Sequence, residues 1–152
     1  MTQKCPVLVT GGAGYIGSHA VLALTDAGWP VAVIDNLVTG FRWAVPEGVP
    51  FYQGDIEDAD LLARIIAEQN IGAVMHFAGS VVVPESVSDP LKYYHNNTAK
   101  SRALLEAAHV EQPGRVDLPA VDVGDPGHRH EDPAAPRHLD DQADDARPGA
   151  GE

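Results

Sequence analysis

The sequence is short of three features, and each shortage narrows the class of protein. Cys5 is the only cysteine, so the chain can form neither an internal disulfide nor a cysteine metal cluster. No apolar run is long enough for a signal peptide or a membrane span, which predicts a cytoplasmic protein without a membrane partner. Lysine and arginine total only 10 against 22 acidic residues, and the net charge of −12 argues against nucleic acid as a partner.

The C-terminal part of the sequence lacks the residues that fill a core. Between residues 113 and 152 there is no aromatic residue, isoleucine, methionine, serine, threonine, asparagine or lysine. Such a composition cannot offset the entropy of an ordered chain, so we expect a domain over residues 1–110 and a disordered tail over 111–152. Translation in a shifted reading frame would also produce this composition, and we hold that as a hypothesis. The tail's histidines His128, His130 and His138 fit no defined metal site, so we expect no metal.

Residues 1–110 alternate between strand and helix patterns. Short apolar runs predict buried strands over 6–10, 31–34, 50–52 and 73–77, and helical spacing predicts helices over 15–27, 58–69 and 91–109. In the first helix this spacing places Ile16, Ala20, Leu24 and Ala27 on one face. The order indicates an α/β fold, a Rossmann-type doubly wound parallel sheet that is incomplete and leaves an edge of the fourth strand exposed.

A glycine-rich turn between the first strand and first helix carries the strongest chemical signal. Gly11, Gly14 and Gly17 fit GxxGxxG, and Gly12 with the last two also fits GxGxxG. Glycines there let the backbone approach a diphosphate, whose charge is met by free N–H groups at the start of the helix. Asp35 ends the second strand, where a carboxylate can bind ribose hydroxyls and repel a 2′-phosphate. This favours NAD over NADP, although Arg42 in the next loop is a cation that a 2′-phosphate would favour.

Further along the chain, the segments TGGAGYIGSH, Asp35-Asn36-Leu37, GDI, HFAG and PESVSDPLKYYHNN follow in an order and spacing that resembles the UDP-glucose 4-epimerases of the extended short-chain dehydrogenase/reductase family. The resemblance covers roughly residues 7–108. It implies NAD as cofactor, a UDP-hexose as substrate, interconversion of UDP-glucose and UDP-galactose, and a homodimer. Val81 departs from it, because a lysine that could meet the cofactor phosphates often stands at this position.

The resemblance also implies roles for individual residues. Backbone N–H groups of Tyr15 and Ile16 would bind the diphosphate, Asp35 and Asn36 the adenosine ribose, and Asp55 and Ile56 would flank the adenine. Three residues at the end of the fourth strand would line the nicotinamide side: Phe77, Ala78 and Gly79. From the last helix, Asn96 would face the cofactor. His76, at the end of a strand, is interpreted as a histidine with satisfied hydrogen bonds and not as a base.

The family's catalytic YxxxK pair is absent from the sequence. No tyrosine is followed four positions later by lysine, so we expect no catalytic residue and a truncated, inactive form of the enzyme. Two alternatives remain open at this point. One is a non-catalytic NAD-binding module, and the other is another nucleotide-sugar enzyme such as a dehydratase.

Overall fold

A computed structural model describes residues 4–111 of the protein; the predicted tail after Glu111, its reading frame and its histidines lie outside the described residues. The sheet is four-stranded and parallel, with the order β3-β2-β1-β4. Its strands are β1 (Val7–Thr10), β2 (Val31–Asp35), β3 (Phe51–Gln53) and β4 (Ala73–His76). This confirms the Rossmann-type fold, and each strand begins and ends within one residue of its prediction.

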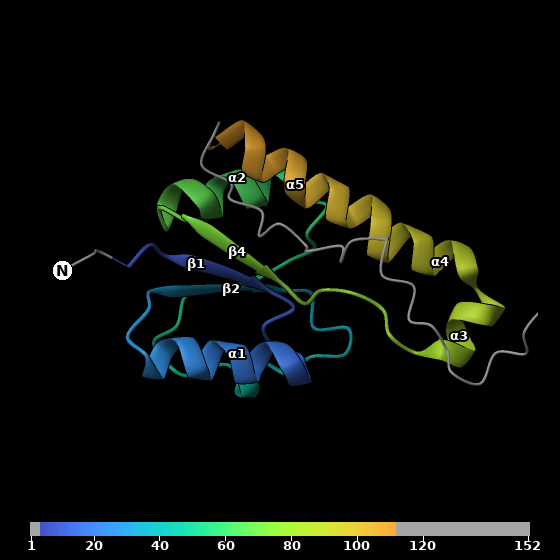
Figure 1. The fold of residues 1–152 in the computed structure, drawn as a ribbon, viewed down its shortest axis with the longest axis horizontal. Helices are drawn as coiled ribbons and strands as arrows, with labels where there is room; N and C mark the ends of the chain where they lie inside the picture. The colour runs from blue at the N-terminus through green and yellow to red at the C-terminus, as the bar shows by residue number, and fades with distance from the viewer. Residues whose placement is uncertain (1–3, 112–152) are drawn as a thin grey trace, which may run out of the picture. The chain divides into compact units, whose positions relative to one another are not determined.

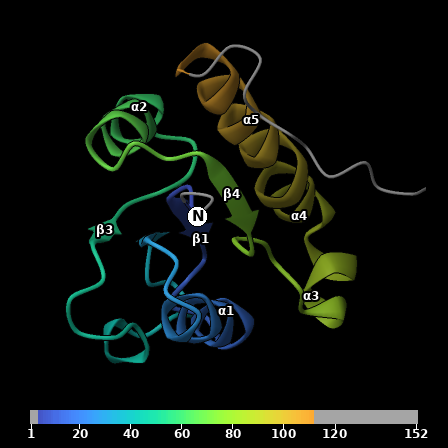
Figure 2. The same ribbon diagram turned by 60° about the vertical axis from the view of Figure 1, so that its left-hand side comes forward.

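Helices cover both faces of the sheet. Helix α1 (Tyr15–Asp26) lies on one face, whereas α2 (Ala59–Glu68) and α5 (Lys100–Glu111) lie together on the other (Figures 1 and 2). Alternate strand residues point to opposite faces, so Val9 and Val33 pack with Val21 of α1, while Leu8 and Ile34 pack with α2 and α5. Two apolar layers result, which is why the central strands β1 and β2 are apolar at successive positions and do not alternate.

Helix α1 lies in its predicted position, but its buried face agrees with the prediction only in part. Ile16 and Ala27 are exposed, and the buried residues include Gly17 and Val21. A Cβ at Gly17 would lie 2.1 Å from the carbonyl oxygen of Gly11. The helix therefore packs against the preceding turn at a residue without a side chain. The predicted stripe is correct for Leu24, which packs against the core, and wrong for Ile16 and Ala27.

The second helix follows the prediction closely. The Asp58 side chain accepts a hydrogen bond from the Leu61 amide, 3.0 Å away, and so caps the N-terminus of α2. Leu62, Ile65 and Ile66 are buried against the sheet, as the helical spacing predicts. At the other end Asn70 has a φ of 49°, a left-handed conformation that turns the chain toward β4.

Between β4 and α5 the structure differs from the prediction in two ways. The segment expected to be a loop contains helix α3 (Val83–Ser88), and the single predicted helix is α4 (Pro90–Tyr94) joined to α5 through one π-helical turn (His95–Ala99). The predicted loop after β2 likewise holds a short 3-10 helix (Arg42–Ala44). Of the helices within residues 4–111, none has the length and apolarity needed to cross a membrane.

Candidate functional site

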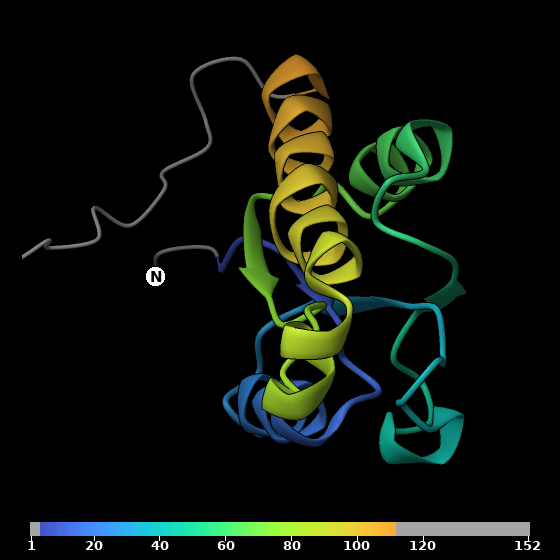
Figure 3. The ribbon, with the colours of Figure 1, turned by 90° about the vertical axis from the view of Figure 1, so that its right-hand side faces the viewer.

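The loops that leave the four strands meet at one edge of the sheet, because the carboxyl ends of parallel strands lie on the same side. Figure 3 looks toward this edge, with α3 and α4 in the foreground. From β1 the chain proceeds to β2 and β3 on one side, whereas β4 adds on the other side. The direction of winding therefore reverses between β1 and β4, and ligands of such sheets bind at this point.

The glycine turn after β1 packs against the loop after β4. Gly11 has a φ of 69°, and a Cβ there would lie 2.6 Å from the amide nitrogen of Ala78 and 2.7 Å from the carbonyl carbon of Phe77. Both contacts are with backbone, so a side chain would have to displace the second loop. The turn closes through a hydrogen bond from the Gly14 amide to the Gly11 carbonyl oxygen, 3.1 Å. The first predicted glycine is thus required by conformation and by close approach.

The start of α1 offers free main-chain donors. Gly14 is the N-cap residue and no side chain caps the helix, so the first-turn N–H groups of Tyr15, Ile16 and Gly17 keep the partial positive charge of a helix N-terminus. The side chains of Tyr15 and Ile16 are 84% and 66% exposed and point away from the core. This arrangement suits an anionic group, and only main-chain atoms would hold it.

Asp35 fixes the turn from the neighbouring strand. Its carboxylate is buried at the end of β2, where Oδ2 accepts a hydrogen bond from the Ala13 amide at 2.9 Å and Oδ1 accepts one from the Leu37 amide at 2.8 Å. Leu37 has a φ of 60°, an unusual conformation for a residue with a branched side chain. Asp35 therefore anchors both loops, a role that its position in the sequence does not reveal, and it keeps spare acceptor positions.

The Arg42 side chain is engaged by contacts near the loop that carries it. Its guanidinium donates to the Val45 carbonyl oxygen at 3.1 Å and lies 4.6 Å from the centre of the Phe51 ring. Both interactions occupy the cation that could have met a 2′-phosphate.

Asn36, Asp55 and Lys100 form a polar chain across three elements. The side-chain Nδ2 of Asn36 donates to Asp55 Oδ2 at 3.1 Å, and the Lys100 amine lies 2.6 Å from the same oxygen. Partial burial alone would raise the pKa of Asp55, but hydrogen bonds from Lys100, the Glu57 amide and Asn36 together lower it below its ordinary value. The Ile56 side chain is buried in the core, so only its main chain is available to a ligand.

Two asparagines of the π-helical turn hold the loop after β4. Asn97 Oδ1 accepts from the Ser80 amide at 2.7 Å and its Nδ2 donates to the Ser80 carbonyl oxygen at 2.9 Å, while Asn96 Nδ2 donates to the Ser80 hydroxyl at 2.9 Å. The predicted site residues Phe77, Ala78 and Gly79 are thereby fixed beside the glycine turn. The sequence predicts a role for Asn96 but none for Asn97. The adjacent Asn96-Asn97 pair is the only feature of the sequence that could have indicated the second contact with the loop.

His76 has a partner for each ring nitrogen, as predicted. Nδ1 lies 2.6 Å from the Thr10 hydroxyl and Nε2 lies 2.9 Å from the Ser101 hydroxyl. Withdrawal of the ring from water lowers its pKa. The imidazole thus ties β1, β4 and α5 together. Within residues 4–111, no three His, Cys, Asp or Glu side chains are grouped so that they could hold a metal ion.

Known proteins are similar to this chain in sequence and in fold over about two thirds of its length. The UDP-glucose 4-epimerase of Azospirillum brasilense is 61% identical over 101 residues, which cover 66% of this chain and 29% of that protein. That of Lactobacillus helveticus is 56% identical over 101 residues, covering 66% and 31%. The crystal structure of UDP-glucose 4-epimerase from Brucella ovis in complex with NAD superposes with a TM-score of 0.68 at 44% identity, covering 70% of this chain and 33% of that one.

The chain spans about 30% of the length of these curated relatives. Residues 7–118 match the family described as the NAD dependent epimerase/dehydratase family. This match covers more than half of the 152 residues and includes every strand and loop of the candidate site, and the chain therefore belongs to the NAD dependent epimerase/dehydratase family.

Proposed function

We propose that this chain binds NAD at the carboxyl edge of its sheet. The main-chain N–H groups at the start of α1 bind the diphosphate, and Asp35 with Asn36 binds the adenosine ribose. Asp55 and the Ile56 main chain adjoin the adenine, and Phe77 to Gly79 line the nicotinamide side. In this proposal residues 1–110 are the NAD-binding half-domain and residues 111–152 a separate tail.

The observation that carries the proposal is the uncapped start of α1 behind a turn in which glycine is required. A Cβ at Gly14 would meet only the Gly11 carbonyl oxygen, at 3.3 Å, so the remaining space beside this residue is open. An extended group with two negative charges fits such a surface, because the main-chain donors are fixed before it arrives. The buried Asp35 carboxylate next to it favours hydroxyl groups over a further phosphate.

NAD supplies a hydride acceptor when it is bound, and in the 4-epimerases the substrate is a UDP-hexose. Turnover also needs a base at the reacting hydroxyl, and the printed sequence holds no tyrosine with a lysine four positions later. This absence supports a second candidate, a non-catalytic NAD-binding module. We therefore propose that the chain by itself binds NAD and does not interconvert UDP-glucose and UDP-galactose.

Calorimetric titration with NAD and an epimerisation assay on both UDP-hexoses test this proposal. The matched variants are Gly11→Ala and Gly48→Ala. Both glycines have a positive φ, 69° and 88°, so both substitutions introduce a similar strain. A Cβ at Gly48 meets nothing within 4 Å, whereas one at Gly11 collides with the loop after β4.

We expect the native chain and Gly48→Ala to bind NAD alike, and Gly11→Ala to lose binding, with no turnover by any of them. Absence of NAD binding by the folded native chain would contradict the proposed cofactor site. Measurable epimerisation would contradict only the proposed inactivity. Equal effects of the two glycine substitutions would show that strain and not loop contact controls binding.

A further inference from the structure

Lys100 makes a partly shielded ion pair with a residue far away in the sequence. It begins α5, and its amine lies 2.6 Å from Oδ2 of Asp55 in the loop between β3 and α2. The two side chains are 15% and 28% exposed. The Arg102–Glu106 pair on the same helix is 79% and 60% exposed, so water screens it far more. The Lys100 pair is thus the stronger constraint on side-chain position.

The Asp55 carboxylate has three donors and room for one more. Oδ2 accepts from Lys100 and from Asn36, and Oδ1 accepts from the Glu57 amide at 3.2 Å. An ionised carboxylate offers about four acceptor positions. One position on Oδ1 therefore remains, and its direction is set by the contacts that hold the other three.

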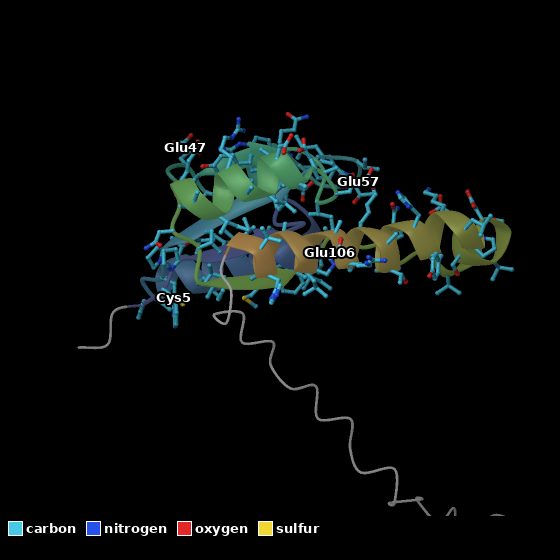
Figure 4. The ribbon with its side chains drawn as sticks, turned by 90° about the horizontal axis from the view of Figure 1, so that it is seen from above. Cys5, Glu47, Glu57 and Glu106 are labelled. Carbon is cyan, nitrogen blue, oxygen red and sulfur yellow. The ribbon has the colours of Figure 1, made fainter. Side chains whose placement is uncertain are left out.

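Lys100 also pairs with a second carboxylate, that of Glu57. Glu57 Oε1 lies 3.9 Å from the Lys100 amine, and its other oxygen lies 3.0 Å from the His95 ring. Figure 4 labels the Glu57 side chain. Without the amine, Asp55 and Glu57 would lose the cation that both contact, and only Asn36 and main-chain groups would hold Asp55. Like charges repel, so the Asp55 carboxylate would turn away from its present orientation.

We propose that Lys100 is a positioning residue for the adenine end of the cofactor site, holding the Asp55 carboxylate so that its free acceptor position meets the amino group of adenine. This inference rests on the proposed function, in which Asp55 adjoins the adenine. Lys100 need not touch the cofactor, because it acts through Asp55. The consequence is that Lys100 controls the preference for a purine that carries an amino group.

Nicotinamide hypoxanthine dinucleotide tests this role, because its purine has a carbonyl oxygen where NAD has the amino group. Calorimetric titration of the full chain with each dinucleotide gives the ratio of the two affinities. We expect the native chain to prefer NAD by about tenfold, the cost of leaving a charged acceptor unpaired. In Lys100→Met the ratio falls to below about twofold, the range expected once the acceptor is no longer aimed.

Arg102→Met is the matched control, since it removes a cation from the same helix without touching Asp55. It should leave the native preference for NAD in place. Lys100→Gln keeps a neutral donor and replaces Lys100→Met if that variant melts below the assay temperature. Its ratio of the two affinities should lie between those of the native chain and of Lys100→Met. An equal loss of affinity for both dinucleotides in the Lys100 variants would reduce Lys100 to a structural role and overturn the inference.

Two further outcomes separate this inference from the proposal beneath it. If the native chain binds both dinucleotides equally, Asp55 does not recognise the amino group, and the inference fails while the cofactor site stands. If the folded native chain binds neither dinucleotide, the proposed function fails, and the role of Lys100 fails with it.

Discussion

Replacing Gly14 by aspartate separates folding from binding at the start of α1. Gly14 has a φ of −78° and a ψ of 173°, which any residue adopts, and no side chain caps the helix. Aspartate at this position is a favourable N-cap, because its carboxylate accepts from the N–H groups of Ile16 or Gly17. Those are the donors that we assign to the diphosphate, so the new side chain occupies the site and adds a negative charge.

The expected magnitudes follow from these contacts. A better cap contributes a few tenths of a kcal/mol, and the 3.3 Å approach of the new Cβ to the Gly11 carbonyl oxygen costs a similar amount. The free energy of unfolding should therefore change by less than about 0.5 kcal/mol. Loss of charge-assisted hydrogen bonds together with repulsion should weaken NAD binding by about 3 kcal/mol, roughly a hundredfold.

Urea unfolding followed by circular dichroism measures the first quantity, and calorimetric titration with NAD measures the second. Gly14→Asn is the neutral control, because it caps the helix in the same way without the charge. It should bind NAD with an affinity between those of the native chain and of Gly14→Asp. An aspartate variant that binds NAD as tightly as the native chain would refute the placement of the diphosphate.

Two further predictions concern stability. Leu62 of α2 is fully buried in the core, so Leu62→Ala should lower the unfolding free energy by about 2 to 5 kcal/mol. Leu22→Ala, on the exposed side of α1, should cost far less. A urea series on both variants checks this, and equal losses would contradict the assigned core. The pKa of His76 lies below its ordinary value of 6.5 in the folded chain, so the unfolded chain binds more protons and stability falls as pH decreases through 6.5. Urea midpoints at pH 7.5 and 5.5 should show a smaller drop in His76→Gln, and an unchanged drop would exclude His76 as its source.

Strands and the second helix could be predicted because their signals are local. Each buried strand is a short apolar run, and α2 has an apolar stripe with a capping aspartate at Asp58. The stripe of α1 could be predicted only in part from apolar spacing. Val21 and Leu24 pack against the sheet, whereas Gly17 packs against the preceding turn, and such spacing ignores glycine. Helix α3 and the π-helical turn could not be predicted from local spacing either, because both depend on contacts between α3, α4 and the loop after β4.

The candidate site divides in the same way. Its main-chain part follows from the sequence, since Gly11 needs a positive φ and Gly17 needs close packing. The side-chain contacts that hold the loops could not be predicted from the sequence, because they join residues far apart in the chain. Asp35 holds Ala13, Asn97 holds Ser80 and Lys100 holds Asp55, and these partners are known only once the sheet is assembled.

These contacts connect the stability of the loops with the affinity of the site. The groups assigned to the diphosphate are main-chain atoms, which most substitutions leave in place, so a residue that holds one of these loops can change the affinity by moving the loop. Each loop is held by a polar contact worth on the order of 1 to 3 kcal/mol if one partner is left unpaired. A substitution at Asn97, which has no assigned contact with the cofactor, should therefore act on NAD binding only through the position of a backbone segment. A substitution at Asp35 should act in the same way and should also remove the carboxylate assigned to the adenosine ribose.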